Sequence, residues 1–194
     1  KEVNNNVLRS CLGLRKYIAS QFRPSAAKAI YEHFNAEHVL DFSSGWGDRL
    51  NGALSSSCVK SYTGVDPSAT LFPNYMKQID MYNSGKAIDF INAAAEDVDF
   101  SRFADKFDMI FTSPPFYILE RYTHESNQSW QRYKVLQHWL EGFLFSTLRS
   151  ITPTLKKNGI LAINISDMYC NHTINKVCDN MNNYIKSLGY TYVG

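Results

Sequence analysis

Residues 39–50 read VLDFSSGWGDRL, an apolar run that passes through two glycines into a segment of helical pattern. Gly45 and Gly47 allow the backbone to turn sharply and to approach a bound molecule closely, and a helix that starts there presents free amide groups. We interpret the stretch as a strand, a cofactor-binding turn and a helix. A lone Gly-x-Gly after a strand is equally typical of an ordinary strand-to-helix connection, so the surrounding sequence has to separate the two interpretations.

Short apolar runs alternate with longer segments of helical periodicity along the chain, which is typical of an α/β fold. Each run is followed by turn residues, as expected of parallel strands that are covered on both faces. We therefore expect a mostly parallel, twisted, Rossmann-like sheet with helices on both faces. The expected strands are residues 38–42, 61–65, 87–92, 107–112 and 159–165.

Helical periodicity predicts three helices, at residues 25–34, 133–151 and 171–188. A strand that is cut short is expected after the last of them, at residues 190–193. The first helix is expected to bury Ala29, Ile30 and Phe34. The second carries one apolar face, made of Leu136, Trp139, Leu140, Phe143, Leu144 and Leu148.

Length and composition fit one globular domain. The chain has 194 residues, of which 44% are hydrophobic and 20% charged, and its formal net charge is +2, so it can bury a sizeable core. We expect a single catalytic domain over residues 1–194, with a helical extension over residues 1–22 and a candidate substrate loop over residues 117–132. Since the first residue is not Met, we also expect the chain to be a piece of a longer protein.

Several classes of protein are disfavoured by what the sequence lacks. No apolar run approaches the roughly 20 residues needed to cross a bilayer, and the start of the chain does not resemble a signal peptide. The four cysteines form no CxxC pair, and the five histidines show no metal-ligand spacing. We therefore expect an intracellular protein, in the cytoplasm or the nucleus, with reduced, buried thiols and no metal.

An acidic residue, Asp66, ends the second expected strand roughly 20 positions after the glycines, where an α/β nucleotide site places its ribose-binding carboxylate. We assign that role to Asp66, with a helix cap as the alternative. Leu50 occupies the third glycine position of a dinucleotide motif, which disfavours a nicotinamide cofactor. After the third strand, residues 92–97 offer small side chains that would admit a flat adenine ring beside Glu96, although a helix cap is equally typical there.

The fourth expected strand leads directly into Ser113, Pro114, Pro115 and Phe116. Because proline fixes the backbone, the Pro114 carbonyl would be held rigidly beside the Ser113 hydroxyl, while Phe116 offers a face for stacking. Such a site suits a planar base that bears an NH2 group, whose nitrogen lone pair is then free to attack a methyl group in line. A Pro-Pro pair without this context is more typical of a rigid turn.

Together these residues resemble the class I S-adenosylmethionine-dependent methyltransferases, and within them the amino-methyltransferases with Asp, Asn or Ser followed by Pro-Pro and Tyr or Phe. The resemblance extends from about residue 22 to residue 193 and implies S-adenosylmethionine as the cofactor. It implies a catalytic set of Ser113, Pro114, Pro115 and Phe116. It implies a cofactor-binding set of Arg23, Pro24, Asp41, Ser43, Gly45, Gly47, Asp66 and Glu96.

Three features depart from the family's pattern. Ser113 replaces the more frequent Asp or Asn, as in many cytosine-N4 enzymes, which leaves the target base open. Trp46 is bulky within the glycine turn, where it would stack on a ligand or crowd it. The last β-hairpin of the fold is expected to be incomplete, so that an edge strand is missing.

The candidate substrate loop, residues 117–132, mixes cations with aromatic rings, as contact with a nucleic-acid strand requires. A solvated lid is an equally good interpretation of the same segment. If the substrate is a duplex, the target base has to be flipped out to reach Phe116. The expected substrate-binding residues are Tyr117, Arg121, Tyr122, Trp130 and Arg132.

The sequence therefore predicts methyl transfer to an exocyclic amino group of a nucleic-acid base, in DNA rather than RNA, at cytosine N4 or adenine N6. Target recognition would come from the loop, from a partner or from a missing region. One alternative is an RNA or protein amide N-methyltransferase. A second is a non-catalytic nucleic-acid-binding subunit that keeps the fold, and a Rossmann-type dehydrogenase is a more distant third.

Overall fold

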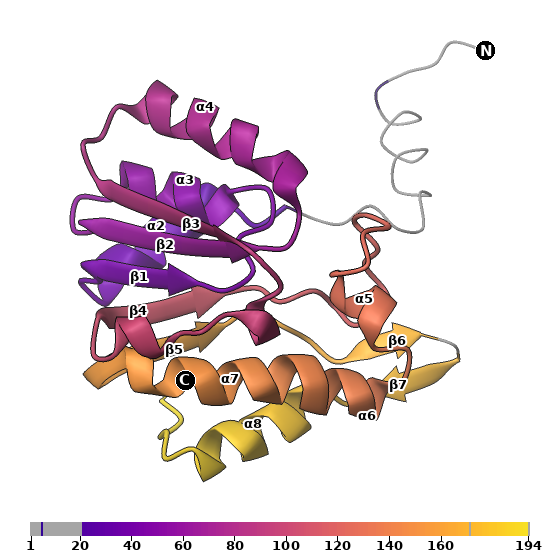
Figure 1. The fold of residues 1–194 in the computed structure, drawn as a ribbon. Coiled ribbons are helices and arrows are strands. Elements are labelled where there is room, and N and C mark those ends of the chain that lie inside the picture. Colours follow the sequence, from indigo (N-terminus) through magenta and orange to yellow (C-terminus); the bar gives the residue numbers. More distant parts are fainter. Residues whose placement is uncertain (1–4, 6–20, 171, 194) are drawn as a thin grey trace.

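A five-stranded, entirely parallel sheet forms the centre of the computed structural model, which describes residue 5 and residues 21–170 and 172–193. The expected extension over residues 1–22 lies almost wholly outside the described residues. The strand order is β3-β2-β1-β4-β5, with helices on both faces (Figure 1). The strands are β1 (His38–Asp41), β2 (Ser61–Asp66), β3 (Ala87–Asn92), β4 (Phe107–Thr112) and β5 (Leu155–Ile163).

Two layers of helices cover the sheet (Figure 1). One layer consists of α2 (Pro24–His33), α3 (Asp48–Ser55) and α4 (Phe72–Tyr82). The other consists of α6 (Leu136–Trp139), the π-helical segment η4 (Leu140–Phe145), α7 (Ser146–Ile151) and α8 (Cys178–Ser187). The short elements are η1 (Ala69–Leu71), η2 (Ala95–Asp97), η3 (Ser101–Phe103), α5 (Ser129–Arg132) and η5 (Thr152–Thr154).

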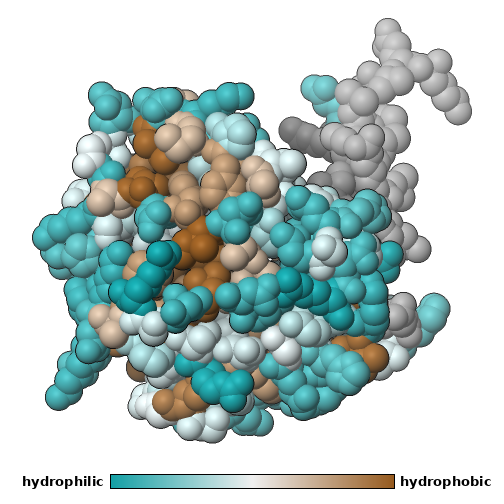
Figure 2. Space-filling model, in the orientation of Figure 1, coloured by the Kyte–Doolittle hydropathy of each residue, from teal (hydrophilic) through white to brown (hydrophobic). Residues whose placement is uncertain are grey.

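The core divides into two clusters because successive strand residues point to opposite faces of the sheet. Val39 and Met109 pack with α2, α3 and α4, whereas their neighbours Leu40 and Ile110 pack with η4 and α7. Figure 2 shows a mostly hydrophilic surface on the visible face, with a hydrophobic patch in the region of the edge strand β3. The central strands β1 and β4 are therefore held rigidly, and their carboxyl ends are fixed relative to one another.

All five expected strands are present, and four of them match within one residue at each end. β5 begins earlier than expected, at Leu155, because residues 155–158 continue the pairing with β4 through an irregular register. The long helix predicted over residues 133–151 begins at Leu136 and includes a π-helical stretch. Its predicted apolar face is buried, except that Leu136 is only half-buried.

Two of the three residues predicted to be buried by the first helix are exposed, and the third, Ile30, is half-buried. In α2 the buried side chains are Ala27 and Tyr31, whereas Ala29 and Phe34 are exposed. The apolar residues Ala29 and Phe34 had suggested that a different face of the helix is buried. The close packing of α2 on α3 decides which face of α2 points into the core. The buried face of α2 contacts Gly52 of α3, where an added Cβ would lie 2.6 Å from the Cβ of Ala27.

The C-terminal part also differs from expectation. The predicted helix over residues 171–188 begins only at Cys178, because β6 (Met168–Cys170) and β7 (Thr173–Asn175) form a separate antiparallel hairpin before it. Asp167 Oδ1 accepts hydrogen bonds from the backbone N–H groups of Val177 and Cys178, at 2.8 and 2.9 Å, and thereby sets the start of α8. Residues 190–193 form no strand. β5 is the outer strand of the main sheet in the described part of the chain.

No helix within the described ranges combines the length and the apolar character that crossing a membrane demands.

Candidate functional site

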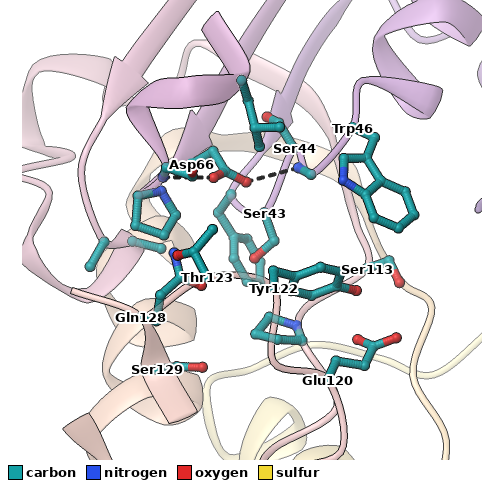
Figure 3. A pocket seen from close by; sticks show the side chains of 18 of the residues that line it. Ser43, Ser44, Trp46, Asp66, Ser113, Glu120, Tyr122, Thr123, Gln128 and Ser129 are labelled. Atoms are coloured by element: carbon teal, nitrogen blue, oxygen red, sulfur yellow. Dashed lines mark hydrogen bonds between the residues drawn. The ribbon is translucent and has the colours of Figure 1, made fainter. Parts of the chain in front are cut away.

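A cavity of about 410 Å³ lies at the carboxyl ends of the parallel strands, and its lining residues come from several elements (Figure 3). It sits where β1 and β4 are neighbours and the strand order reverses direction. Open α/β sheets bind their ligands at this topological switch point, because the loops that follow the two strands diverge there. Two segments line the cavity from β1 and β4: the glycine turn, residues 43–47, and the proline tip, residues 113–116.

Asp41, the last residue of β1, is fully buried next to the cavity and is the centre of a hydrogen-bond network. Its carboxylate accepts hydrogen bonds from Arg49 Nε at 2.7 Å, Tyr62 Oη at 2.7 Å and Thr112 Oγ1 at 2.9 Å. The backbone N–H of Ser43 also donates to it, at 3.1 Å. A buried carboxylate requires such compensation, and these four donors tie together β1, β2, β4 and α3. Asp41 itself does not line the cavity.

Arg49, in the first turn of α3, balances this buried charge. Its guanidinium also donates to the Ser43 carbonyl, and it lines the cavity. Burial opposes its positive charge, but the Asp41 carboxylate and the Tyr62 hydroxyl more than offset this effect and raise the pKa of Arg49 above its ordinary value. The guanidinium therefore stays charged, and its hydrogen bond to the Ser43 carbonyl holds the glycine turn in position.

The glycine turn adopts backbone conformations that favour glycine. Gly45 has φ 55° and Gly47 has φ 87°, both in the left-handed region. An added Cβ at Gly47 would also lie 2.3 Å from Gln78 Oε1, so no larger side chain fits without movement. Trp46, between the two glycines, is 41% exposed and lines the cavity.

Asp66, at the end of β2, lines the cavity and lies directly against the glycine turn. Its two carboxylate oxygens accept hydrogen bonds from the backbone N–H groups of Gly45 and Ser68, each at 2.9 Å (Figure 3). Burial raises the pKa of Asp66 to about 6, although the two backbone donors act in the opposite direction. Each oxygen keeps further acceptor capacity, so Asp66 can bind hydroxyl groups of a ligand.

The end of the cavity next to Asp66 combines small residues with polar groups. Ala94, Ala95 and Glu96 line it, and burial raises the pKa of Glu96 above its ordinary value. Asn127 also lines it and donates from Nδ2 to the Pro67 carbonyl at 2.9 Å. Within the described part of the chain, the buried Asn127 Oδ1 has no hydrogen-bond partner. This oxygen can therefore accept a hydrogen bond from a ligand.

The proline tip forms the opposite wall. Ser113, Pro115 and Phe116 line the cavity, whereas Pro114 is buried beside it. The Ser113 hydroxyl donates to the backbone carbonyl of Asn164 at 3.0 Å, and Asn164 Nδ2 donates to Ser113 Oγ at 3.1 Å. The tip thus presents a ring, a hydroxyl and a rigid backbone to the same space as the glycine turn.

The 117–132 loop contributes one of its five predicted substrate-binding residues to the cavity, Tyr122, whose ring projects into it (Figure 3). Tyr117 is buried in the core, where its hydroxyl donates to the Lys134 carbonyl at 2.7 Å. The Trp130 indole donates to the Thr123 carbonyl at 3.0 Å, and the Arg121 guanidinium lies 5.3 Å from its ring centre. These residues therefore pack within the loop.

Four more predicted site residues lie outside the cavity lining. Arg132 forms ion pairs with Glu96 at 3.1 Å and with Asp97 at 2.6 Å, which fastens the end of the loop to η2. Arg23 and Pro24 form the start of α2 and do not line the cavity, although the preceding Gln21 and Phe22 do. Gly47, the residue before α3, shapes the turn without lining the cavity.

Other lining residues were not identified from the sequence. Asn164 follows β5 directly, and a polar residue at the end of an apolar strand was a usable signal. The remainder lie in loops or in helices, where no pattern distinguishes a residue that lines a cavity from one that is solvated or packed in the core. They are Gln21, Phe22, Phe42, Ser44, Asp48, Arg49, Pro67, Ser68, Thr70, Leu71, Glu120, Thr123, Asn127, Gln128, Ser129 and Phe143.

Comparison with known proteins gives one matching family model, over part of the chain, and a set of similar folds. Residues 107–191 match the DNA methylase family model N6_N4_Mtase. The structure is similar to that of TrmN from Thermus thermophilus, with a TM-score of 0.53 and 20% identity over 72% of this chain and 37% of that chain. It is also similar to the tRNA (m1A58) methyltransferase TrmI from Aquifex aeolicus, with a TM-score of 0.50 and 15% identity over 76% of this chain and 48% of that chain.

A third similar structure, the [4+2]-cyclase SpnF, has a TM-score of 0.57 and 14% identity over 86% of this chain and 56% of that chain. The chain thus spans between 37% and 56% of the length of these three proteins. No curated protein sequence matches it. At such identities the similarity establishes the Rossmann-like class I methyltransferase fold, which confirms the predicted fold class.

Proposed function

We propose that this chain, which carries the DNA methylase family pattern over residues 107–191 on a class I methyltransferase fold, transfers a methyl group from S-adenosylmethionine to an exocyclic amino group of a DNA base. One observation carries the proposal. The glycine turn and the proline tip come from neighbouring strands and line the same cavity. A methyl donor held by one segment can therefore face a nitrogen held by the other.

S-adenosylmethionine is the cofactor that methyltransferases of this family use, and the residues of the cavity fit it. Asp66 keeps acceptor capacity suited to ribose hydroxyls, and the buried Asn127 Oδ1 has no partner among the described residues. Ala94 and Ala95 leave room for a flat ring. We assign cofactor binding to Ser43, Gly45, Asp66 and Glu96, and we keep Gly47, Arg23 and Pro24 as residues that shape the binding segment.

Asp41 has a different part in the proposal from the one that the resemblance implied. Its carboxylate already accepts five hydrogen bonds from four residues and is fully buried. We infer that it acts through Arg49 and Ser43, whose positions it determines, and not by touching the cofactor. When bound, S-adenosylmethionine supplies an electrophilic methyl group on its sulfonium centre.

The proline tip would orient the substrate. Ser113 Oγ would accept a hydrogen bond from one N–H group of the amine, and Phe116 would stack on the plane of the base. The resemblance assigns the second N–H group to the carbonyl of Pro114, a residue that lies beside the cavity and not in its lining. The nitrogen lone pair then points toward the methyl donor. Alignment of this kind is a sufficient source of rate enhancement when the donor is already reactive. Pro115 keeps the tip rigid.

The target proposed is cytosine N4 or adenine N6 in DNA. A duplex substrate would have to release the base from its stack before it could reach Phe116. The 117–132 loop, a partner protein or a further region of the protein would then supply sequence recognition. We propose that the protein works inside the cell, in the cytoplasm or the nucleus, because that is where DNA and S-adenosylmethionine are both available.

The test is mass spectrometry of nucleosides from DNA that has been incubated with the protein and S-adenosylmethionine. We expect N4-methylcytosine or N6-methyladenine with the unmodified protein and neither with Ser113→Ala. The matched control is Ser187→Ala, whose hydroxyl donates only to the Tyr184 carbonyl on the exposed side of α8. It should methylate like the unmodified protein.

Parallel incubations with RNA and with protein test the competing substrates. Methylation of either one, without methylated DNA, would replace the proposal by the RNA or protein amide activity. Calorimetry tests the non-catalytic alternative, since a protein that binds DNA but not S-adenosylmethionine cannot be a methyltransferase.

A further inference from the structure

We propose that Asn164 is a positioning residue that keeps the Ser113 hydroxyl as a hydrogen-bond acceptor toward the target amine, and so makes the site selective for an amino group over a carbonyl group. This inference rests on the proposed function. It concerns a residue that the sequence did not mark as part of the site. Both side chains line the cavity.

The sheet places the two residues next to each other. Thr112 of β4 pairs with Ile163 of β5 in parallel register, so Ser113 and Asn164 are the first residues beyond the two strand ends. The backbone N–H of Asn164 donates to the Thr112 carbonyl at 2.9 Å and extends the pairing by one step. The position of Asn164 relative to Ser113 is therefore set by the backbone of two buried strands and does not depend on a mobile loop.

The hydrogen bonds between Ser113 and Asn164 leave the Ser113 hydroxyl able only to accept a further hydrogen bond. A serine hydroxyl has one hydrogen to donate and two lone pairs that accept. Ser113 Oγ lies 3.0 Å from the Asn164 carbonyl oxygen, and because a carbonyl only accepts, the hydroxyl hydrogen is committed to it. Asn164 Nδ2 donates to one lone pair of Ser113 Oγ at 3.1 Å. One lone pair remains, and it can only accept.

The same count of donors and acceptors around Ser113 Oγ determines the orientation of the Asn164 side-chain amide. If its oxygen faced Ser113, two acceptors would meet, since the hydroxyl hydrogen is already bound to the backbone carbonyl. The nitrogen must therefore be the atom that faces Ser113, which agrees with the contact of 3.1 Å. The two hydrogen bonds between Ser113 and Asn164 are therefore compatible with each other, and they direct the remaining lone pair of Ser113 Oγ into the cavity.

The chemical consequence is discrimination between amino and carbonyl groups. An exocyclic amine on cytosine or adenine would donate an N–H to the remaining lone pair of Ser113. A carbonyl oxygen at the same place, as in uracil or hypoxanthine, would meet an acceptor and find no donor there. Asp or Asn at position 113 would carry an acceptor oxygen of its own, whereas a hydroxyl can donate or accept and needs a neighbour to decide which it does.

A double-mutant cycle tests the inference. Methyl transfer to DNA is measured for the unmodified protein, Asn164→Ala, Ser113→Asn and the double variant. We expect Asn164→Ala to lower kcat about tenfold, with KM and the affinity for S-adenosylmethionine nearly unchanged, because one orienting hydrogen bond is lost. In the Ser113→Asn background, Asn164→Ala should have almost no further effect. Asn180→Ala, which removes an exposed asparagine on α8, is the matched control and should leave kcat unchanged.

Equal losses from Asn164→Ala in both backgrounds would indicate a merely structural role and overturn the inference, as would the absence of any loss. A second measurement does not depend on turnover. Fluorescence anisotropy compares the binding of short single-stranded oligo(dC) with oligo(dU), and of oligo(dA) with oligo(dI). We expect tighter binding of the amino-bearing member of one pair. The preference should be smaller for Asn164→Ala, because this variant keeps the backbone carbonyl that takes the hydroxyl hydrogen but loses the Nδ2 contact that fixes the direction of the remaining lone pair.

An unchanged preference in the Asn164→Ala protein would also overturn the inference. The two proposals can fail separately. A protein that transfers no methyl group but still prefers the amino-bearing oligonucleotide through Asn164 would refute the proposed function alone. A protein that methylates DNA without any dependence on Asn164 would refute this inference alone.

Discussion

Trp46 and Tyr122 meet edge to face at the cavity, with their ring centroids 5.7 Å apart and their planes at 90°. Trp46 belongs to the glycine turn and Tyr122 to the 117–132 loop, so the contact joins the proposed cofactor segment to the proposed substrate segment. Both rings remain more than 40% exposed, at 41% and 46%. Exposed rings beside a binding cavity are suited to stacking on bases, and this pair therefore gives the first prediction.

Tyr122→Ala should weaken the binding of single-stranded DNA by about 1–3 kcal/mol if a base stacks on the ring. Its melting temperature should change little, because the ring is half exposed. Fluorescence anisotropy at one fixed salt concentration measures the affinity. Tyr169→Ala, which removes another exposed ring at 67% exposure on the β6–β7 hairpin, is the control. Equal affinities for the two variants would contradict a stacking role.

Arg49→Met should destabilise the fold by about 3–5 kcal/mol, because it leaves the buried Asp41 carboxylate without its cationic partner. Urea unfolding measures the loss. The control is Lys60→Met, which breaks an ion pair of similar length, 2.8 Å to Glu37, between exposed side chains. Surface pairs contribute about 0–1 kcal/mol, so a similar loss in both variants would argue against a special role for the buried pair.

The stability of the protein should depend on pH through Asp66. Burial raises the pKa of Asp66 to about 6 from 3.8, so folding favours the protonated form. The stability that this contributes is fully present below about pH 4 and is lost as the pH rises through about 6. Relative to Asp66→Asn, the unmodified protein should lose roughly 3 kcal/mol across this range. Urea unfolding at a series of pH values measures both profiles, and parallel profiles would refute the assignment.

Cofactor binding should follow the same titration in the opposite sense. The ionised carboxylate is the better acceptor for ribose hydroxyls, so the affinity of the unmodified protein for S-adenosylmethionine should fall as the pH drops below about 6. Calorimetry at several pH values gives this dependence. In Asp66→Asn the affinity should be lower and should not vary over this range.

Gly47→Ala should destabilise the fold more than Gly85→Ala. Both glycines have positive φ, 87° and 68°, so alanine is strained at either position, at about 1 kcal/mol. At Gly85 the added Cβ meets nothing within 4 Å, whereas at Gly47 it would lie 2.3 Å from Gln78 Oε1. The difference between the two melting temperatures isolates this close approach. Adding Gln78→Ala should restore part of the loss at Gly47 and none at Gly85.

Phe116→Ala should greatly reduce turnover while leaving the affinity for S-adenosylmethionine nearly unchanged, because Phe116 is assigned to the base and Asp66 to the cofactor. Radiolabelled methyl transfer and calorimetry measure the two quantities. Phe34→Ala, which removes an exposed ring at 41% exposure beyond the end of α2, is the control. A collapse of cofactor affinity in Phe116→Ala would show that the proposed division of roles is wrong.

The features predicted correctly from the sequence are those that depend on residues close together in the chain. The strands are short apolar runs, and β3 and β4 match the prediction at both ends. The glycine turn and the proline tip were also recognisable, because glycine and proline constrain the backbone at their own positions. The helix before residue 178 was predicted wrongly, since the hairpin of β6 and β7 depends on a pairing that local periodicity does not reveal.

The 117–132 loop shows most plainly what the sequence does not determine. Arg121, Trp130 and Arg132 have the residue types of a nucleic-acid contact, yet Arg132 pairs with Glu96 and Asp97, and Trp130 packs within the loop. A charged or aromatic residue has the same sequence signature whether it faces a ligand or a neighbour. Only the positions of the surrounding elements decide which of the two it does.

The sequence by itself determined the α/β class, the position of the glycine turn after β1 and that of the proline tip after β4, because backbone preference and hydrophobic periodicity act over a few residues. Only the tertiary structure decided that Asp41 is saturated by donors from β2, β4 and α3, and that Ser113 shares its hydrogen bonds with Asn164, 51 residues away. Such partners meet through the strand order 3-2-1-4-5, which is a property of the packed sheet and of no single segment.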